Sequence, residues 1–252
     1  MTRGKRMKKN NNTKIIFYFI IYFLLFFVLI YSGIKIYEWY RDKNKNNEIA
    51  KKIKETVIVE SNGKNKEEYL IDFDKLKEQN NEAIAWIKVN NTNIEYPVVK
   101  TKNNEFYLNH SFDKSENLGG WIFADHKNKF NGTDKNIVIY GHNMKDNSMF
   151  GTMQNILNQE WYNNEENTNI ILKTEGENYI YKVFSIYRIE NEDYYIKTEF
   201  SNDSEFEQFL NTLKARSIRD FNMDMLESDS ILTLSTCDNN NKYRVVLHAK
   251  KI

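Results

Sequence analysis

The sequence contains one cysteine, Cys237, which ends the apolar run "DSILTLSTC", and Arg244 follows it seven residues later. A thiol becomes a nucleophile when it loses its proton, and a guanidinium can stabilise a developing negative charge on oxygen. A lone cysteine can equally be a small buried apolar residue, because free cysteines are among the most buried residue types. The residues around Cys237 are therefore needed to distinguish a reactive thiol from a thiol buried in the core.

Strand periodicity separates Cys237 from the apolar face of its own strand. In "SILTLSTC" the two leucines share one face, so Cys237 shares the opposite face with Thr233 and Ser235. The turn "DNNNK" joins this strand to "YRVVLHAK" and predicts a hairpin, in which Arg244 lies near Cys237 across the strand pair. This arrangement favours a reactive thiol with a nearby cation. The alternative for Arg244 is a solvated cation at a strand edge.

Four histidines are candidates for the general acid–base that a thiol nucleophile needs. His110 lies in the polar stretch "LNHSFDK", which predicts an exposed loop residue, and His248 is expected to be a hydrogen-bonded strand histidine. His126 follows Asp125, which could orient it, yet it lies in a turn-like segment. His142 follows the apolar strand "NIVIYG" and caps its end, where active sites are often built. We therefore favour His142 as the acid–base.

The N-terminal residues predict a membrane anchor. Residues 15–34 are twenty residues without a charge, the length that crosses about 30 Å of hydrocarbon as a helix. Residues 1–14 carry six basic residues and no acidic one, which predicts that this end stays in the cytoplasm and the rest lies outside. A cleaved signal peptide is the alternative, but its apolar stretch is shorter, and "YSGIKIYEWY" offers a poor cleavage site.

Composition excludes several classes of protein. The 252 residues have a formal net charge of +1, and because the N-terminal tail is basic, the remainder is mildly acidic. Nucleic-acid binding needs clustered basic residues on the folded surface, so we do not expect it. The sequence has no cluster with metal-ligand spacing and no phosphate-binding loop, and we expect no metal and no cofactor.

The pattern of apolar residues predicts a stalk followed by a β domain. Residues 35–68 are charged and rich in Asn and Lys, with apolar residues spaced by four, which predicts a juxtamembrane helix or stalk. After residue 68, short β-branched or aromatic runs are separated by Asn, Gly and Asp turns, which predicts an antiparallel sheet or barrel. Within the insertion at residues 190–229, a helical apolar stripe predicts one helix that covers an edge of the barrel. Ser204 and Glu207 are its expected capping box.

Three motifs in this order resemble the class B sortases of Gram-positive bacteria. They are "YGHNM" around His142, "TLSTC" ending in Cys237 and "YRVVLHAK" holding Arg244, and they follow an N-terminal anchor. The resemblance covers about residues 69–252. It implies a mainly β fold, an eight-stranded β-barrel with N-terminal helices and an inserted helix before the cysteine strand. A class C sortase would be expected to show a lid and often a C-terminal membrane segment, and neither is evident.

The residue patterns and the resemblance together predict a domain organisation and a localisation. The expected parts are a cytoplasmic basic tail at 1–14, a transmembrane signal anchor at 15–34, a juxtamembrane helix or stalk at 35–68 and a sortase catalytic domain at 69–252. The protein would be a single-pass membrane protein with its catalytic domain outside the cytoplasm.

Sortases are thiol transpeptidases, and the resemblance implies that chemistry here. Cys237 would attack the carbonyl that follows a threonine in a C-terminal sorting signal and form a thioacyl-enzyme. His142 would protonate the leaving amine and then deprotonate the incoming amine, and Arg244 would stabilise the oxyanion or hold the threonine. The expected partners are surface proteins with a signal of Asn-Pro-x-Thr-Asn or Ser-Pro-x-Thr-Gly type, and a peptidoglycan precursor, a pilin or another amine as acceptor.

The same resemblance suggests which residues line the substrate groove. They are Asn104, Leu108, Tyr195, Ile196 and Ser235. Plain core packing is the alternative for each of the apolar and aromatic ones.

Two functions from other classes stay open at the level of the sequence. One is an envelope cysteine peptidase that passes its acyl group to water. The other is an anchored binding module without catalysis, whose 32 Phe and Tyr residues form a binding platform and whose Cys237 is inert.

Overall fold

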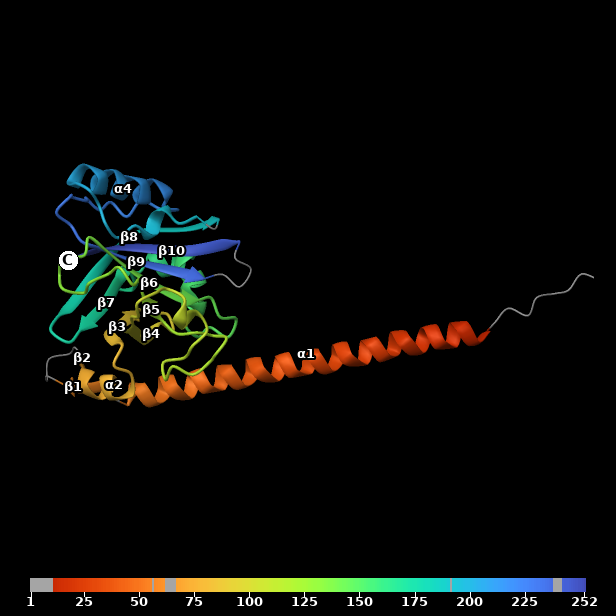
Figure 1. Cartoon of the computed structure of the whole chain (residues 1–252). Coiled ribbons are helices and arrows are strands. Elements are labelled where there is room, and N and C mark those ends of the chain that lie inside the picture. Colours follow the sequence, from red (N-terminus) through yellow and green to blue (C-terminus); the bar gives the residue numbers. More distant parts are fainter. Residues whose placement is uncertain (1–10, 56, 62–66, 191, 238–241) are drawn as a thin grey trace, which may run out of the picture. The chain divides into compact units, whose positions relative to one another are not determined.

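A computed structural model describes residues 11–55, 57–61, 67–190, 192–237 and 242–252 of the chain. The chain divides into two compact units, residues 1–44 and residues 45–252, and each is described by itself (Figure 1). The elements in chain order, with η for 3-10 helices, are α1 (Asn11–Lys54), β1 (Val57–Ser61), β2 (Glu67–Ile71), α2 (Phe73–Gln79), β3 (Ala83–Val89), β4 (Glu95–Val99), η1 (Phe106–Leu108), β5 (Phe123–Ala124), β6 (Asn136–His142), η2 (Gly151–Leu157), α3 (Gln159–Tyr162), η3 (Glu165–Thr168), β7 (Asn169–Thr174), β8 (Asn178–Glu190), η4 (Tyr194–Ile196), α4 (Asp203–Arg216), β9 (Ile231–Cys237) and β10 (Tyr243–Lys251).

The first unit is helical throughout its described part. Residues 15–34, expected to be the anchor, lie within α1, and nearly all of their large apolar side chains are exposed. α1 is long and apolar enough to cross a membrane. It is a candidate membrane span, consistent with the predicted anchor.

The second unit begins earlier than the boundary expected at residue 69. The last turns of α1 belong to it, because Ile53 is fully buried in the main core and the amide of Asn46 donates to the main-chain oxygen of Gly120 at 3.1 Å. β1 and β2 then form a separate antiparallel pair, which joins residues on both sides of that boundary. Part of the expected stalk is therefore part of the folded unit.

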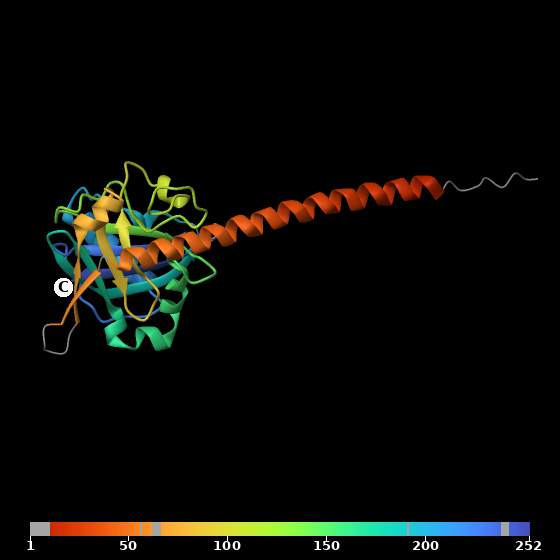
Figure 2. The ribbon, with the colours of Figure 1, turned by 90° about the horizontal axis from the view of Figure 1, so that it is seen from below.

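Eight strands form the closed barrel that the resemblance implies, in the order β10-β8-β7-β3-β4-β5-β6-β9 (Figures 1 and 2). Most neighbours are antiparallel, as the sequence predicts, but β4 pairs with β5 and β6 pairs with β9 in parallel. The inward faces fill one core. Leu232 and Leu234 of β9 belong to it, which confirms the predicted alternation in that strand, and so do Val245 and Leu247 of β10.

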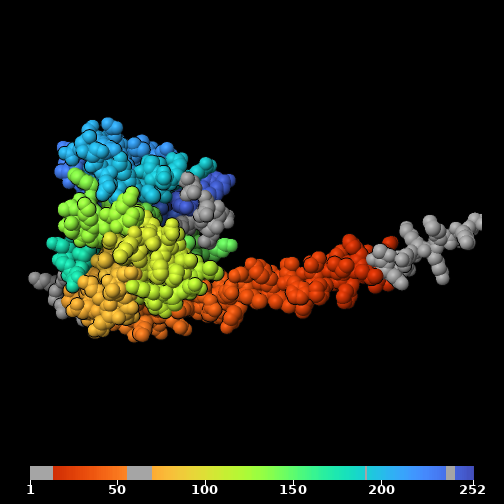
Figure 3. Space-filling model, in the orientation of Figure 1, coloured from red at the N-terminus to blue at the C-terminus, as the bar shows by residue number. Residues whose placement is uncertain are grey.

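The insertion before β9 contains the predicted helix, α4, which lies over β8 and β10 (Figure 1). In the space-filling view the insertion forms the blue top of the barrel unit (Figure 3). Its predicted apolar residues are all buried: Phe206, Phe209, Leu210 and Leu213. They pack on a second apolar cluster that includes Phe184 and Val246, on the outer faces of β8 and β10. Because the barrel is closed, α4 covers a face and not an edge, and that part of the prediction was wrong.

The capping of α4 also differs from the prediction of Ser204 with Glu207. The N-cap is Asn202, whose Oδ1 accepts a hydrogen bond from the backbone N–H of Glu205 at 2.9 Å. Glu205 reaches back and accepts from the backbone N–H of Ser201 at 2.6 Å. The helix therefore begins two residues earlier than expected, because asparagine caps a helix about as well as serine.

Candidate active site

The parallel pairing of β6 with β9 brings His142 beside Cys237. The register runs from Asn136 opposite Ile231 to His142 opposite Cys237, so both strands end at the same place. Neighbouring strands lie about 4.8 Å apart, and residues in register on parallel strands point to the same face. The pairing concerns the backbone of Cys237, since its thiol lies outside the described part of the chain. The backbones of His142 and Cys237, the two residues selected from the sequence, therefore lie side by side at the ends of their strands.

The main-chain oxygen of Leu108 fixes the imidazole of His142. Nε2 of the ring lies 2.7 Å from that oxygen. A carbonyl oxygen only accepts, so Nε2 carries the proton, and Nδ1 is the nitrogen that is free to take up and release one. Burial lowers the pKa of His142 below its usual range, the Leu108 carbonyl raises it, and the charge of Arg244 lowers it further. The arrangement suits an acid–base with one defined working nitrogen.

Arg244 lies on β10, between β8 and β9. It is opposite Ile189 of β8, and its charge acts on His142. Its Nη1 atom is buried and has no hydrogen-bond partner among the described residues. A buried N–H group without an acceptor costs roughly 1–3 kcal/mol. This nitrogen therefore offers a donor to an oxygen that enters the site.

The other three histidines lie apart from this arrangement or are already hydrogen-bonded. β5 runs antiparallel to β6, so the chain after Ala124 leads toward the start of β6 and takes His126 away from His142. His110 is only half exposed, because its ring stacks on Phe106 at 3.9 Å between centroids. His248 is fully buried, as a hydrogen-bonded strand histidine should be.

Four of the five expected groove residues fall into two groups. Leu108 and Ile196 are half buried, and their side chains have surface to offer a ligand. Tyr195 and Ser235 are each 2% exposed, and their hydroxyls lie 2.9 Å apart. This pair joins η4 to β9 two residues before Cys237.

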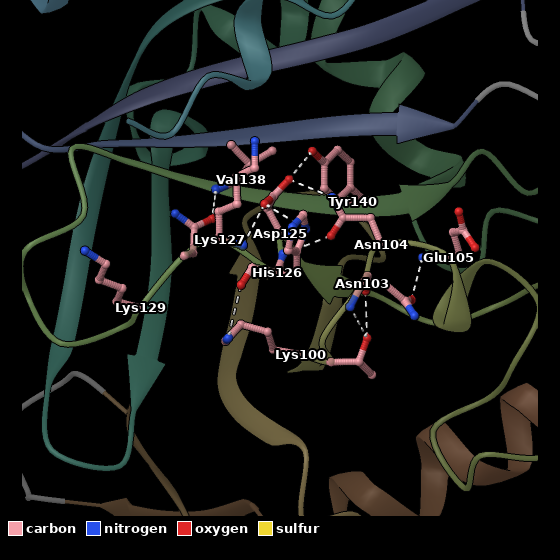
Figure 4. Close-up of polar contacts among 12 residues, drawn as sticks. Lys100, Asn103, Asn104, Glu105, Asp125, His126, Lys127, Lys129, Val138 and Tyr140 are labelled. Atoms are coloured by element: carbon pink, nitrogen blue, oxygen red, sulfur yellow. Dashed lines mark hydrogen bonds and ion pairs between the residues drawn. The ribbon is translucent and has the colours of Figure 1, made fainter. Parts of the chain in front are cut away.

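Asn104 is held by the protein itself. Its Nδ2 donates to Oδ2 of Asp125 at 2.7 Å, and its Oδ1 accepts from the backbone N–H of His126 at 2.9 Å (Figure 4). From the sequence, Asp125 was expected only as a possible partner for His126, whose Nδ1 lies 3.6 Å from Oδ1 of Asp125.

Two main-chain features of the site were not predicted from the sequence. One is the carbonyl of Leu108, which no residue type reports. The other is Gly120, which has φ of +54° and lies against the turn that carries this carbonyl. The pair of glycines in "LGGW" was the signal that could have indicated a left-handed backbone there.

No cluster for a metal ion is present in the parts of the chain that the structure describes, where no group of three His, Cys, Asp or Glu side chains could hold one. The chemistry of the described site is that of an imidazole and a guanidinium placed around the end of the cysteine strand.

Comparison with known proteins places this arrangement in a family. A family model described as a sortase domain matches residues 87–252. Sortase B of Listeria monocytogenes is 33% identical over 233 residues, which cover 89% of this chain and 92% of that protein. A crystal structure of sortase B from Bacillus anthracis matches with a TM-score of 0.74 and 30% identity, covering 84% of this chain and 99% of that one.

A sortase B structure from Clostridium perfringens matches with a TM-score of 0.67 and 37% identity, covering 72% of this chain and all of that one. The likeness thus extends over the whole barrel and includes the strands that carry His142, Cys237 and Arg244. The chain belongs to the sortase family of cysteine transpeptidases, and within that family to the class B sortases.

Proposed function

We propose that this protein is a membrane-anchored sortase that cleaves a C-terminal sorting signal after threonine and joins the acyl group to an amine of the cell envelope. The observation that carries the proposal is the register of β6 with β9, which sets His142 opposite Cys237. A nucleophile and its acid–base must lie within hydrogen-bond reach of one reacting centre, and neighbouring parallel strands allow that.

In the proposed reaction, the Cys237 thiolate attacks the threonine carbonyl carbon and forms a tetrahedral intermediate. The C–N bond then breaks, Nδ1 of His142 gives its proton to the leaving amine, and a thioester remains on Cys237. An incoming amine attacks this thioester, His142 takes its proton, and the thiolate leaves. The transferred proton is thus returned, and the enzyme ends as it began.

Arg244 is proposed to hold the oxyanion of each tetrahedral intermediate. The unpartnered Nη1 supports this role, because a donor that is already desolvated and in place needs little reorganisation when charge develops. Holding the substrate threonine is the alternative role for the same donor. Leu108 and Ile196 are proposed to contact the apolar part of the signal, with Asn104 at the border of the groove.

The basic residues before the apolar helix support the proposed orientation, with residues 1–14 in the cytoplasm, residues 15–34 in the membrane and the barrel outside. A catalytic unit on the outer side meets substrates that have already crossed the membrane. The proposed partners are surface proteins with a sorting signal and a peptidoglycan precursor or another amine.

The test uses the full-length protein in detergent micelles with labelled peptides that carry Asn-Pro-Ala-Thr-Asn or Ser-Pro-Ala-Thr-Gly, with and without triglycine. We expect cleavage after threonine and, with triglycine, a peptide–amine adduct detected by mass spectrometry. Hydrolysis alone, unchanged by the amine, would indicate a peptidase. An intact peptide together with a thiol that alkylators reach only after unfolding would indicate a binding module.

A further inference from the structure

A buried carboxylate lies where the loop that carries Leu108 meets the strand that carries His142. Asp125 follows β5 directly and is 4% exposed. Burying a charged carboxylate is unfavourable unless hydrogen bonds compensate it, so its partners show what it holds together.

Two elements share one oxygen of this carboxylate (Figure 4). Oδ2 accepts from Nδ2 of Asn104 at 2.7 Å and from the hydroxyl of Tyr140 at 2.9 Å. The other oxygen, Oδ1, accepts from the backbone N–H of Lys127 at 2.9 Å. One oxygen therefore joins the loop before η1 to β6, and the second keeps the carboxylate in place.

Asn104, the partner of Asp125 in the loop, lies about one turn before Leu108. Next to Asn104, Oδ1 of Asn103 accepts from the backbone N–H groups of Glu105 and Phe106 at 3.0 and 3.1 Å, and so starts η1. Leu108 ends η1 and presents its carbonyl to His142. The position of Asn104 therefore sets where this carbonyl lies.

Tyr140, the partner of Asp125 on β6, lies close to His142 in the same way. Tyr140 and His142 are two residues apart on β6 and so point to the same face of the barrel. The hydroxyl of Tyr140 and the imidazole of His142 thus approach the loop from the same side, one at each end of residues 104–108.

We propose that Asp125 is a positioning residue of the active site, which holds the loop at residues 103–108 against β6 so that the Leu108 carbonyl meets Nε2 of His142. The proposal rests on the proposed role of His142 as the acid–base. Asp125 would thus act on the site indirectly, because its described contacts include neither the imidazole of His142 nor the cysteine strand.

Exchanging the two side chains tests the link. In the wild type, the Lys127 N–H and the amide of Asn104 donate to different oxygens of Asp125. Asp125→Asn keeps only one of these acceptor oxygens, so the new NH₂ group must face one of the two donors. Asn104→Asp sets two carboxylates against each other at hydrogen-bond distance. In the double variant the amide at position 125 turns its oxygen toward the Lys127 N–H, and its NH₂ group donates to the new carboxylate at position 104 and to the hydroxyl of Tyr140, which now accepts. The new carboxylate accepts from the His126 N–H. Net charge is also restored.

Two readouts on the full-length protein in micelles distinguish positioning from a merely structural role. The first is kcat for transpeptidation, kept apart from KM because Asn104 is also proposed to border the groove. The second is the imidazole ¹⁵N spectrum, with His142 assigned by comparison with His142→Ala, which reports the ring tautomer. This spectrum needs no substrate, so it tests the proposal even if the proposed function fails.

A matched control is Asp134→Asn. Asp134 also holds a loop, accepting from the backbone N–H groups of Lys129 and Phe130 at 2.9 and 2.7 Å, but none of its described contacts reaches the residue 103–108 loop or His142. We expect it to lower the melting temperature while kcat and the His142 spectrum stay those of the wild type.

For Asp125→Asn we expect kcat to fall about tenfold or more, since small misplacements of a catalytic group have such effects, and the Nε2–H tautomer to lose its dominance. The double variant should recover kcat to within about threefold of wild type. If Asp125→Asn does not fold, Asn104→Ala takes its place, because it removes the link and leaves the carboxylate two donors. A wild-type tautomer and kcat in the single variants, or a double variant no better than the worse single one, would overturn the proposal.

Discussion

Gly120 lies directly against the imidazole of His142: a β-carbon at Gly120 would stand 3.0 Å from Cδ2 of the ring. The same atom would lie 2.4 Å from the main-chain oxygen of Tyr107 and 2.8 Å from that of Leu108. The turn that orients the histidine therefore leaves space for hydrogen alone at this position.

Gly120→Ala should consequently displace the Leu108 carbonyl or the imidazole. We expect kcat to fall at least tenfold, together with a lower melting temperature. Gly132→Ala is the matched control, because Gly132 also has a positive φ, +84°, but a β-carbon there meets nothing within 4 Å. Gly132→Ala should lower the free energy of unfolding by about 1–2 kcal/mol, the strain of a left-handed backbone, and leave kcat at the wild-type value. Equal activity of the two variants would contradict the crowding argument.

The two rival histidines can be separated by alanine substitution. His142→Ala should lower turnover about 10²-fold or more, as loss of a general acid–base does. His126→Ala should be nearly silent, because its ring is exposed and the chain carries it away from the end of β6. Both rates are compared at the same pH with the same peptide. A larger loss of turnover for His126→Ala would show that the assignment of the acid–base to His142 is wrong.

Arg244→Lys keeps the positive charge and loses the forked set of donors. If Nη1 holds an oxyanion, the variant should lose about 10²–10³-fold in kcat with little change in melting temperature. Arg219→Lys is the control: Arg219 donates to the main-chain oxygen of Tyr162 at 2.9 Å and to Oδ1 of Asn163 at 2.7 Å. It should affect stability alone. Near-normal turnover in Arg244→Lys would reduce Arg244 to a surface cation.

His248 should make stability depend on pH. Its ring is fully buried, with Nε2 2.9 Å from the hydroxyl of Tyr187 and Nδ1 2.8 Å from that of Thr233, and burial lowers its pKa to about 3. The unfolded histidine takes up a proton near pH 6.5, whereas the folded one stays neutral. Its contribution is therefore complete above pH 6.5 and is lost as the pH falls from there toward 3, by up to about 1.4 kcal/mol per pH unit.

Chemical denaturation of wild type and His248→Gln between pH 8 and pH 5 measures this contribution. The wild type should lose stability more steeply below pH 6.5, and the difference in slope belongs to His248. Carboxylates such as Glu205, whose pKa the neighbouring Lys197 helps to lower to about 2, act equally on both proteins. Parallel curves would show that His248 does not titrate between the folded and unfolded states.

Local patterns predicted much of the part of the fold that forms the site. The alternation in the cysteine strand, β9, predicted which of its residues face the core, and the helical spacing of apolar residues predicted α4. Both are properties of neighbouring residues. The capping of α4 was displaced by two residues, because Asn202 and Ser204 are both good caps and the sequence does not rank them.

Contacts between distant segments could not be read from local patterns. The parallel pairing of β6 with β9 joins strands that are far apart in the sequence, and no local pattern predicted it. The resemblance implied only that His142 and Cys237 belong to one site. The carbonyl of Leu108 acts through the main chain, which every residue has, and Asp125 acts through partners on both sides of it in the sequence. Such groups become visible only when tertiary structure brings their partners together.

The central claim is that Cys237 forms a thioester with the sorting signal. Intact-mass spectrometry tests it most directly: the full-length protein is mixed with the sorting peptide without an amine and quenched in acid, and the adduct is located by digestion. We predict a mass increase equal to the peptide fragment ending in threonine, attached at Cys237 and lost when triglycine is added. Cys237→Ala should show no adduct at an unchanged melting temperature. Cleavage of the peptide by Cys237→Ala within tenfold of the wild-type rate would contradict the account.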